Sequence, residues 1–376
     1  MIDRDYLKTL AAYHNERGFM LTVSLSTSRL DDWRQTAPTF LNSEFNRIIK
    51  ERNPEKEYKR ILEEDFQRVL EVLNYEVEQR TQGLVVVADG SQGVFEHLQL
   101  PLRLQNRLIV EPHPYIRPLV HAMAVMESFL VVRVSRDESS IYLVDWWQLT
   151  REDSFEGPYL RSGDRETGEA PVKEYYAAAR QESLVDQHFK DVGQALDRLL
   201  EETGVRRVAI CGQHEIAVKF CRQLPARTNA KVVAEIPCDA SASLNQLLVA
   251  AREAIYDARI GEQSRLVTRV HEGLGPQGLG VAGFDQTMQA LALGQVQILL
   301  VERGHRPPGC MCMQEGLIRV TEEAACPACG GPTIYLDDIL GEAVRQAILQ
   351  GAEVEVVERV DLLHDMGGIA ALLRYK

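Results

Sequence analysis

The chain has 376 residues, of which 45% are hydrophobic and 26% are charged, as in an ordinary globular protein. This length exceeds what one compact core holds and predicts two or three domains. The formal net charge of -13 excludes a general non-specific coat for nucleic acids, because binding many phosphates needs clustered Lys and Arg, although a local basic face remains compatible with it.

The hydropathy pattern favours a cytoplasmic protein. The chain has no run of 18 apolar residues, which a transmembrane helix would need. The segment from Met1 to Tyr6 is charged and lacks the apolar core of a signal peptide.

Residues 1–122 predict an α/β domain. Two helical faces with i, i+3, i+4 spacing lie within residues 39–81, and Asn53-Pro54 separates them because Asn-Pro favours a turn. The apolar run Gly83–Ala88 is typical of a strand covered on both faces. The other predicted elements are a helix at 3–16 and strands at 19–27, 94–98 and 108–111.

Residues 123–260 predict a middle domain with a mixed sheet. Two strands at 128–134 and 140–147 form a hairpin, and the aperiodic segment 150–174 follows. A structureless loop this long is usually functional or disordered. Alternating helices and strands then indicate a parallel or mixed sheet covered by helices, with helices at 174–203, 215–223 and 243–260 and strands at 205–211 and 231–236.

Residues 261–376 predict a second, smaller α/β layer, so the expected fold class is α/β (α+β) with three domains. An insert rich in cysteine occupies residues 304–332. The remaining elements are helices at 262–272, 284–293 and 336–350, a helical turn at 362–366, and strands at 296–301, 353–357 and 369–375.

Four of the seven cysteines are clustered, as Cys310-Met-Cys312 and Cys326-Pro-Ala-Cys329-Gly-Gly. Two close pairs of thiolates predict a tetrahedral, all-cysteine zinc site, which would be structural because it leaves no open coordination position. An unoccupied or degenerate ribbon and an iron–sulfur cluster are the alternatives. The other three cysteines are expected to be small buried apolar residues: Cys211, Cys221 and Cys238.

The segment between Phe155 and Lys173 is either a functional loop or a disordered surface loop. Its charges nearly balance, so electrostatics alone does not mark it for RNA. As a candidate contact for rRNA or tRNA, it offers Tyr159, Arg161, Gly163, Arg165, Gly168 and Lys173. The stretch Gly278–Gly283 matches G-x-G-x-x-G, but it follows no predicted strand, which a dinucleotide site requires, so a connector is favoured.

Three stretches of the last third resemble the final domain of the archaeal and eukaryotic class-one peptide-chain release factors and their relative Pelota. They are Gly280–Val301, the segment that begins Gly351-Ala-Glu-Val, and the closing Gly367-Gly-Ile-Ala-Ala-Leu-Leu-Arg-Tyr375. The middle third resembles that family's middle domain in its order of elements. The first third resembles its first domain only in outline.

The resemblance is to the bacterial branch of this family, which includes the hibernation factor Balon. It implies a last domain like the kink-turn-binding ribosomal proteins, which docks a translational GTPase, and a middle loop that reaches the peptidyl transferase centre. The family's Gly-Gly-Gln, which positions the hydrolytic water, is absent from this sequence, as is the stop-codon reader Asn-Ile-Lys-Ser. We therefore expect a ribosome-binding factor that occupies the A site without releasing peptide, and no catalytic residue.

Two alternatives remain open. The first is a hydrolase or nuclease for tRNA or peptidyl-tRNA on stalled ribosomes, with Asp164, Arg165 and Glu166 of the loop as candidate groups. The second is a free-standing RNA-binding protein of the kink-turn-binding type, against which the acidic balance counts.

Overall fold

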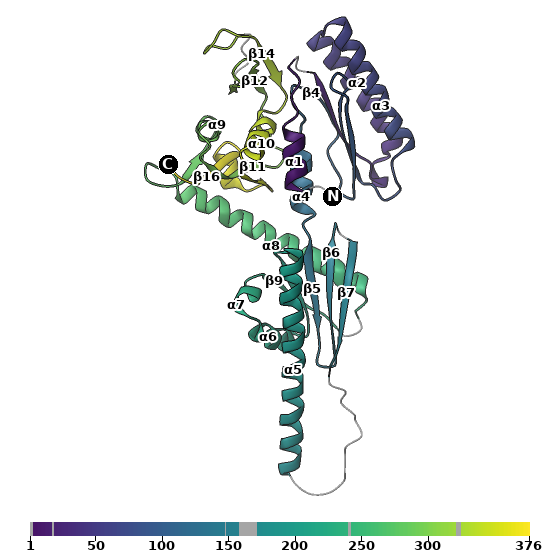
Figure 1. Cartoon of the computed structure of the whole chain (residues 1–376), viewed down its shortest axis with the longest axis vertical. Helices are drawn as coiled ribbons and strands as arrows, with labels where there is room; N and C mark the ends of the chain where they lie inside the picture. The colour runs from purple at the N-terminus through teal and green to yellow at the C-terminus, as the bar shows by residue number, and fades with distance from the viewer. Residues whose placement is uncertain (1–2, 17–18, 147, 158–170, 240–241, 321–324) are drawn as a thin grey trace. The chain divides into compact units, whose positions relative to one another are not determined.

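The computed structural model describes residues 3–16, 19–146, 148–157, 171–239, 242–320 and 325–376 (Figure 1). Within them the chain forms four β-sheets and two compact units. Unit 1 combines residues 1–125 with residues 263–376, and unit 2 comprises residues 126–262. The α/β fold class is confirmed. The division of unit 1 into a first and a last domain stays a prediction.

The first part of unit 1 is a four-stranded antiparallel sheet in the order β3-β2-β1-β4. Its strands are β1 (Met20–Ser26), β2 (Gly83–Asp89), β3 (Val94–Leu100) and β4 (Arg107–Glu111). The central strands β1 and β2 are buried along their whole length. Buried side chains of α2 (Trp33–Arg52) and α3 (Lys56–Tyr75) form one core with this sheet.

The first helix of the chain and α2 have other bounds than the sequence predicts. The predicted break between α2 and α3 is confirmed at Asn53, whose φ of 40° ends α2. The helix itself begins at Trp33, earlier than predicted, and holds Pro38 inside. The helical segment at 3–16 is confirmed only for α1 (Arg4–Ala11), which Asp3 caps by accepting a hydrogen bond from the Tyr6 N–H.

The last part of unit 1 holds a second four-stranded sheet in the order β10-β16-β11-β15, and β11 and β15 are parallel. Its strands are β10 (Gly280–Ala282), β11 (Val296–Glu302), β15 (Glu353–Val357) and β16 (Ile369–Leu373). Its helices are α9 (Phe284–Ala292), α10 (Ile339–Leu349) and α11 (Asp361–Asp365). A three-stranded sheet that belongs to the cysteine insert completes the unit.

A buried ion pair joins the two parts of unit 1. Arg117 begins α4 (Arg117–Val125), a helix that the proline-rich segment did not predict. Its Nη1 lies 2.7 Å from Oδ2 of Asp338, and these side chains are 5% and 0% exposed. The Tyr115 hydroxyl donates to the same oxygen at 2.7 Å. Arg117 also donates to the backbone carbonyls of Glu302 and His305. Every polar atom of this cluster that the structure places in the core thus has a partner, as buried charges require.

Unit 2 is a five-stranded mixed sheet in the order β7-β6-β5-β8-β9. Its strands are β5 (Phe129–Val134), β6 (Glu138–Asp145), β7 (Gln148–Glu156), β8 (Val208–Gly212) and β9 (Val232–Pro237). Its helices are α5 (Pro171–Thr203), α6 (His214–Gln223), α7 (Ala226–Asn229) and the first part of α8 (Leu244–Glu272). One core lies between the sheet and α5 with α6, and a second core packs the other face against α8.

Two predictions for unit 2 were wrong. The segment predicted to be structureless, residues 150–174, begins within strand β7, which pairs with β6 along its length. Its residues are mostly exposed, so no apolar alternation marks them. The helices predicted at 243–260 and 262–272 form the single helix α8, which continues through Gly261. No helix within the described ranges is both long and apolar enough to cross a membrane.

Unit 2 contains a buried histidine that makes its stability depend on pH. His188 on α5 is 6% exposed and shares a 2.9 Å hydrogen bond with the Ser139 hydroxyl on β6. Burial lowers the pKa of His188 below 6.5, against the smaller opposite influence of Asp191 and Asp137. The unfolded chain therefore takes up this proton at a higher pH than the folded chain.

We expect the free energy of unfolding of unit 2 to be fully developed above pH 6.5 and to fall as the pH drops from 6.5 toward the lowered folded-state pKa. Urea midpoints measured at pH 7.5 and 5.5 test this. The difference between the two midpoints should shrink in His188→Gln and persist in His214→Gln, whose side chain is exposed in the same unit. An equal pH dependence in all three proteins would contradict the assignment.

Candidate metal centre

The cysteine insert folds as a ribbon of three short strands, β12 (Gly309–Cys312), β13 (Ile318–Arg319) and β14 (Thr333–Leu336). Strand β12 is central and pairs antiparallel with both neighbours. One tight turn follows β12, and a second lies between β13 and β14. In the first, the Gly316 N–H donates to the carbonyl of Cys312 at 2.9 Å, and in the second the Gly330 N–H donates to the carbonyl of Cys326 at 2.7 Å. Each turn thus begins at a cysteine and brings that sulfur to the same place.

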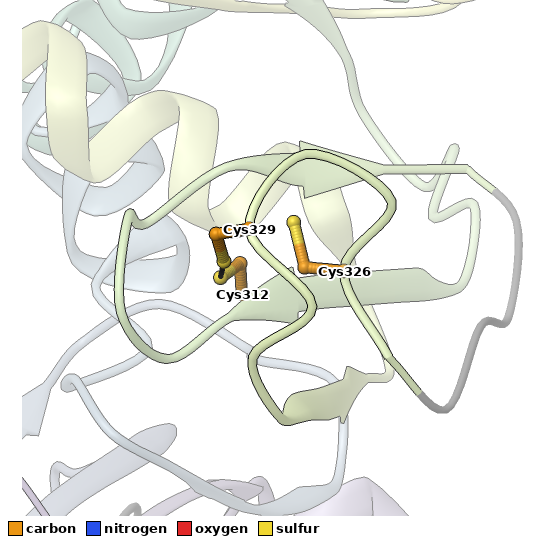
Figure 2. A group of neighbouring side chains, drawn as sticks. All are labelled: Cys312, Cys326 and Cys329. Carbon is orange, nitrogen blue, oxygen red and sulfur yellow. Dashed lines mark hydrogen bonds between the residues drawn. The ribbon is translucent and has the colours of Figure 1, made fainter.

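Three thiols meet at these turns (Figure 2). The sulfur atoms of Cys312, Cys326 and Cys329 all lie within 4.8 Å of one another, and those of Cys312 and Cys329 are 3.4 Å apart. Sulfur atoms around a tetrahedral zinc ion lie about 3.8 Å apart, given Zn–S bonds of about 2.3 Å. Cys312 and Cys326 are buried and Cys329 lies at the surface. The three cysteines could therefore bind a metal ion with little rearrangement.

The glycine pair after Cys329 lets the backbone turn toward the sulfur of that residue. The N–H of Gly331 points at the Cys329 sulfur, 3.4 Å away. A Cβ at this position would lie 2.6 Å from Gln314 Oε1 and 3.2 Å from the Cys329 sulfur. A side chain at this position would therefore displace the Gln314 amide and crowd the Cys329 sulfur.

The pKa values of the neighbouring thiols of Cys312 and Cys329 shift in opposite directions. Hydrogen bonds from the backbone of Glu315 and Gln314 lower the pKa of Cys312, against the opposite influence of burial. At Cys329 the Gly331 N–H acts in the same direction, but the neighbouring Cys312 thiol and burial outweigh it and raise the pKa to about 11. Two thiolates this close repel each other, and a divalent cation between them would remove the repulsion.

Cys310, the fourth predicted ligand, lies outside this group of three. It is buried on β12, two residues before Cys312, so the two side chains emerge on the same face of the strand. The first turn of the site begins at Cys312. Cys310 lies before this turn, within the strand. That Cys310 completes the site stays a prediction.

The remaining predicted site residues belong to the segment between Phe155 and Lys173. Tyr159, Arg161, Gly163, Arg165 and Gly168 lie outside the described residues, as do Asp164 and Glu166. Lys173 lies within α5, in a stretch whose side chains are not described. Of the three scattered cysteines, Cys211 and Cys221 are buried, as predicted, whereas Cys238 is only half-buried, so the prediction was wrong for it. Burial raises the pKa of Cys211 to about 12 and that of Cys221 to about 11, which makes both poor nucleophiles.

Comparison with known proteins supports the resemblance that the sequence predicts. Residues 114–255 match the model of bacterial archaeo-eukaryotic release factor family 10. This range contains nearly all of unit 2, so the match to bacterial archaeo-eukaryotic release factors concerns that part of the chain. No curated protein matches the chain.

Three solved structures are similar to this chain at low sequence identity. The archaeal translation termination factor aRF1 is 19% identical, with 100% of this chain and 99% of that chain covered and a TM-score of 0.26. Pelota from Archaeoglobus fulgidus is 12% identical over 100% of this chain and 93% of its own, with a TM-score of 0.36.

Dom34 from S. cerevisiae, described as a translation termination-like factor that interacts with Hbs1, is 11% identical over 78% and 81%, with a TM-score of 0.42. TM-scores this low carry no functional conclusion.

Proposed function

Because residues 114–255 match the model of bacterial archaeo-eukaryotic release factor family 10, we propose that this chain is a ribosome-binding translation factor that occupies the A site without releasing the nascent peptide. The proposed role is ribosome hibernation or ribosome protection in the cytoplasm. The observation that carries it is a release-factor-like middle unit whose sequence lacks Gly-Gly-Gln.

The missing tripeptide decides between binding and hydrolysis. Hydrolysis of the ester bond of peptidyl-tRNA needs a water molecule held at the carbonyl carbon, and in this family a backbone group and the Gln of Gly-Gly-Gln hold it. The loop between Phe155 and Lys173 contains neither a pair of glycines nor a Gln. A middle unit of this kind fills the site that a release factor uses and leaves the ester bond intact.

The last domain is the proposed docking surface for an elongation-type GTPase. Its sequence resemblance to the final domain of the release factors, above all in Gly367–Tyr375, supports this assignment. The structure places most of that segment in β16, inside the second sheet of unit 1.

Zinc is the proposed metal of the cysteine ribbon, with Cys312, Cys326 and Cys329 as ligands and Cys310 as the fourth. Thiolates are soft ligands that zinc prefers, and all-cysteine zinc sites hold structure. When bound, the ion supplies the links that join the two turns. The ribbon's own residues contribute the N–H groups that face the sulfurs and the glycines that let the turns meet.

Sedimentation with ribosomes tests the proposal directly. Purified protein is mixed with 70S ribosomes that carry peptidyl-tRNA in the P site, spun through a sucrose cushion, and assayed for released peptide. We expect the protein in the ribosome pellet and peptide release no faster than without protein, with a Gly-Gly-Gln release factor as the positive control.

A matched variant, in which a Gly/Ser linker of the same length replaces residues 158–170, measures what the loop contributes to binding. Absence from the pellet, at an ionic strength low enough to preserve phosphate contacts, contradicts the proposal. Release of peptide, or cleavage of the tRNA, also contradicts it and favours a hydrolase or nuclease that acts through this loop.

A further inference from the structure

Unit 1 contains a small cavity whose lining carries unusual charge. Its volume is about 50 Å³, and four arginines line it: Arg103, Arg117, Arg303 and Arg306. No carboxylate is found among the described residues of the lining. A water molecule needs about 10–15 Å³ of such space, so the cavity has room for several waters or for one group of comparable size.

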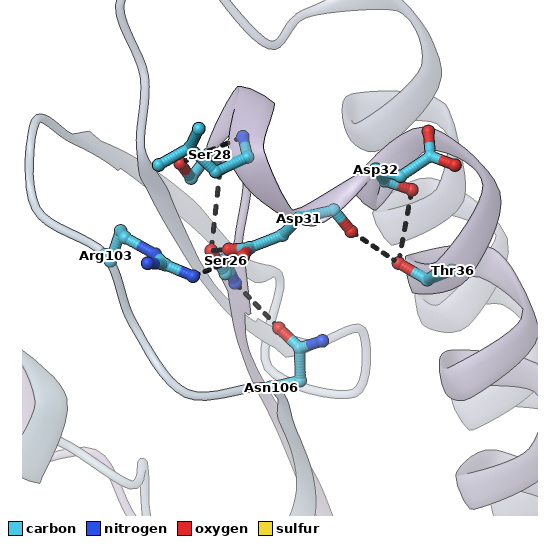
Figure 3. Close-up of polar contacts among 8 residues, drawn as sticks. Ser26, Ser28, Asp31, Asp32, Thr36, Arg103 and Asn106 are labelled. Carbon is cyan, nitrogen blue, oxygen red and sulfur yellow. Dashed lines mark hydrogen bonds and ion pairs between the residues drawn. The ribbon is translucent and has the colours of Figure 1, made fainter.

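Three of the four guanidinium groups already have carboxylate partners that do not line the cavity. Arg117 pairs with the buried Asp338 at 2.7 Å. Arg303 pairs with Glu358 at 2.8 Å. Arg103 pairs with Asp31, which also accepts a hydrogen bond from the Ser26 hydroxyl (Figure 3). Their positive charges are therefore largely balanced.

Arg306 is different. It follows the end of β11 and precedes Pro307-Pro308. Within the described part of the chain it forms no ion pair, and its Nε is buried without a hydrogen-bond acceptor. A buried donor that lacks a partner is costly and calls for a ligand or an ordered water that supplies an oxygen. The positive charge of Arg306 favours an anion over a neutral water molecule.

We propose that this cavity binds a phosphate-sized oxyanion, with Arg306 as the residue that determines its affinity. A guanidinium group offers a planar fork of N–H donors that matches two oxygens of a phosphate group. The lining also includes the neutral side chains of Tyr115 and Ser24 and the buried imidazole of His121, so its permanent positive charge comes from arginine. The anion is either a free phosphate or one phosphate of an RNA backbone, and the two share this chemistry.

Binding of inorganic phosphate to the full chain tests the proposal. Phosphate is titrated against chloride at constant ionic strength, and affinity is measured by calorimetry and by the rise in unfolding temperature. We expect Arg306→Gln to weaken binding about tenfold or more, because a charge-assisted pair of hydrogen bonds is lost. Arg359→Gln is the matched control, because Arg359 is exposed near β15 and does not line the cavity.

A second variant and an RNA displacement experiment complete the test. If Arg306→Gln does not fold by far-ultraviolet circular dichroism, Arg306→Lys keeps the charge but loses the fork and should show intermediate affinity. A short single-stranded RNA that displaces phosphate from the natural protein identifies the RNA backbone as the source, and failure to displace it identifies a free anion. The proposal is overturned if phosphate stabilises the natural protein no more than chloride does, or if Arg306→Gln binds phosphate as tightly.

Discussion

Cys326→Ser is expected to remove the metal ion from the protein and to loosen the ribbon formed by β12, β13 and β14. Cys326 is 3% exposed, and its sulfur lies within 4.8 Å of those of Cys312 and Cys329. A serine oxygen is a harder and weaker zinc ligand than a thiolate. Removal of one ligand should reduce zinc affinity by at least about 100-fold, more than the loss of an outer-shell hydrogen bond costs. Elemental analysis after dialysis measures the zinc content.

The same change should lower the stability of the ribbon, because the free energy of metal binding is free energy of folding. Amide hydrogen exchange over residues 309–336 should accelerate in Cys326→Ser and in the natural protein treated with a chelator, but not elsewhere. Cys238→Ser is the matched control, since this thiol lies on the other unit and outside the cluster. Full zinc content in Cys326→Ser would rule out the site.

Cys310→Ser separates the four-cysteine site from a three-cysteine site. Loss of zinc in this variant supports Cys310 as the fourth ligand. Retention of zinc assigns the fourth position to another donor and leaves the cluster of three intact.

Arg117→Met should lower the free energy of unfolding of unit 1 by about 3–5 kcal/mol, because it leaves the carboxylate of Asp338 buried without a counter-charge. Asp338 is 0% exposed, and the Tyr115 hydroxyl remains as its side-chain donor. The two units need not unfold together, so a signal from unit 1 alone is required. Fluorescence of the buried core residue Trp33 supplies it in a background where Trp146 and Trp147 are replaced by Phe.

Two further variants test whether the loss of stability in Arg117→Met comes from the unpaired charge of Asp338. Arg117→Met combined with Asp338→Asn should recover part of the loss, because no charge stays buried and Asn still caps α10 in place of the Asp338 oxygen that accepts from Leu340. Arg60→Met breaks an exposed pair with Glu64 and should change stability by no more than about 0.5 kcal/mol. A loss below about 1 kcal/mol for Arg117→Met would mean that the buried pair contributes little.

The sequence predicted the elements that have a strong apolar pattern. The break between α2 and α3 at Asn53 and the buried strand β2 were both marked by local chemistry. Strand β7 had no such mark, because it is an edge strand with mostly exposed side chains. Gly261 suggested a helix boundary, since Gly costs about 1 kcal/mol in a helix. Apolar side chains of α8 pack into one core before Gly261 and into another after it, and this packing outweighs the cost.

The metal centre and the arginine cavity also differ in how far the sequence could predict them. The two cysteine pairs are local motifs, so spacing alone indicated a metal centre, whereas the position of Cys310 outside the sulfur cluster depends on three-dimensional geometry. The arginine cavity draws its lining from β1, from the segments before and after β4, and from the segment after β11. No stretch of sequence contains that pattern, so only the fold shows it.

The discontinuity of unit 1 has a consequence for synthesis of the protein. Arg117 and Asp338 are 221 residues apart. At about 5–20 residues per second, a translating ribosome makes the second roughly 10–45 seconds after the first. Throughout that interval the surface that Asp338 will cover stays open to solvent. We therefore expect unit 2 to reach its native state first during translation, although half of unit 1 is made before it.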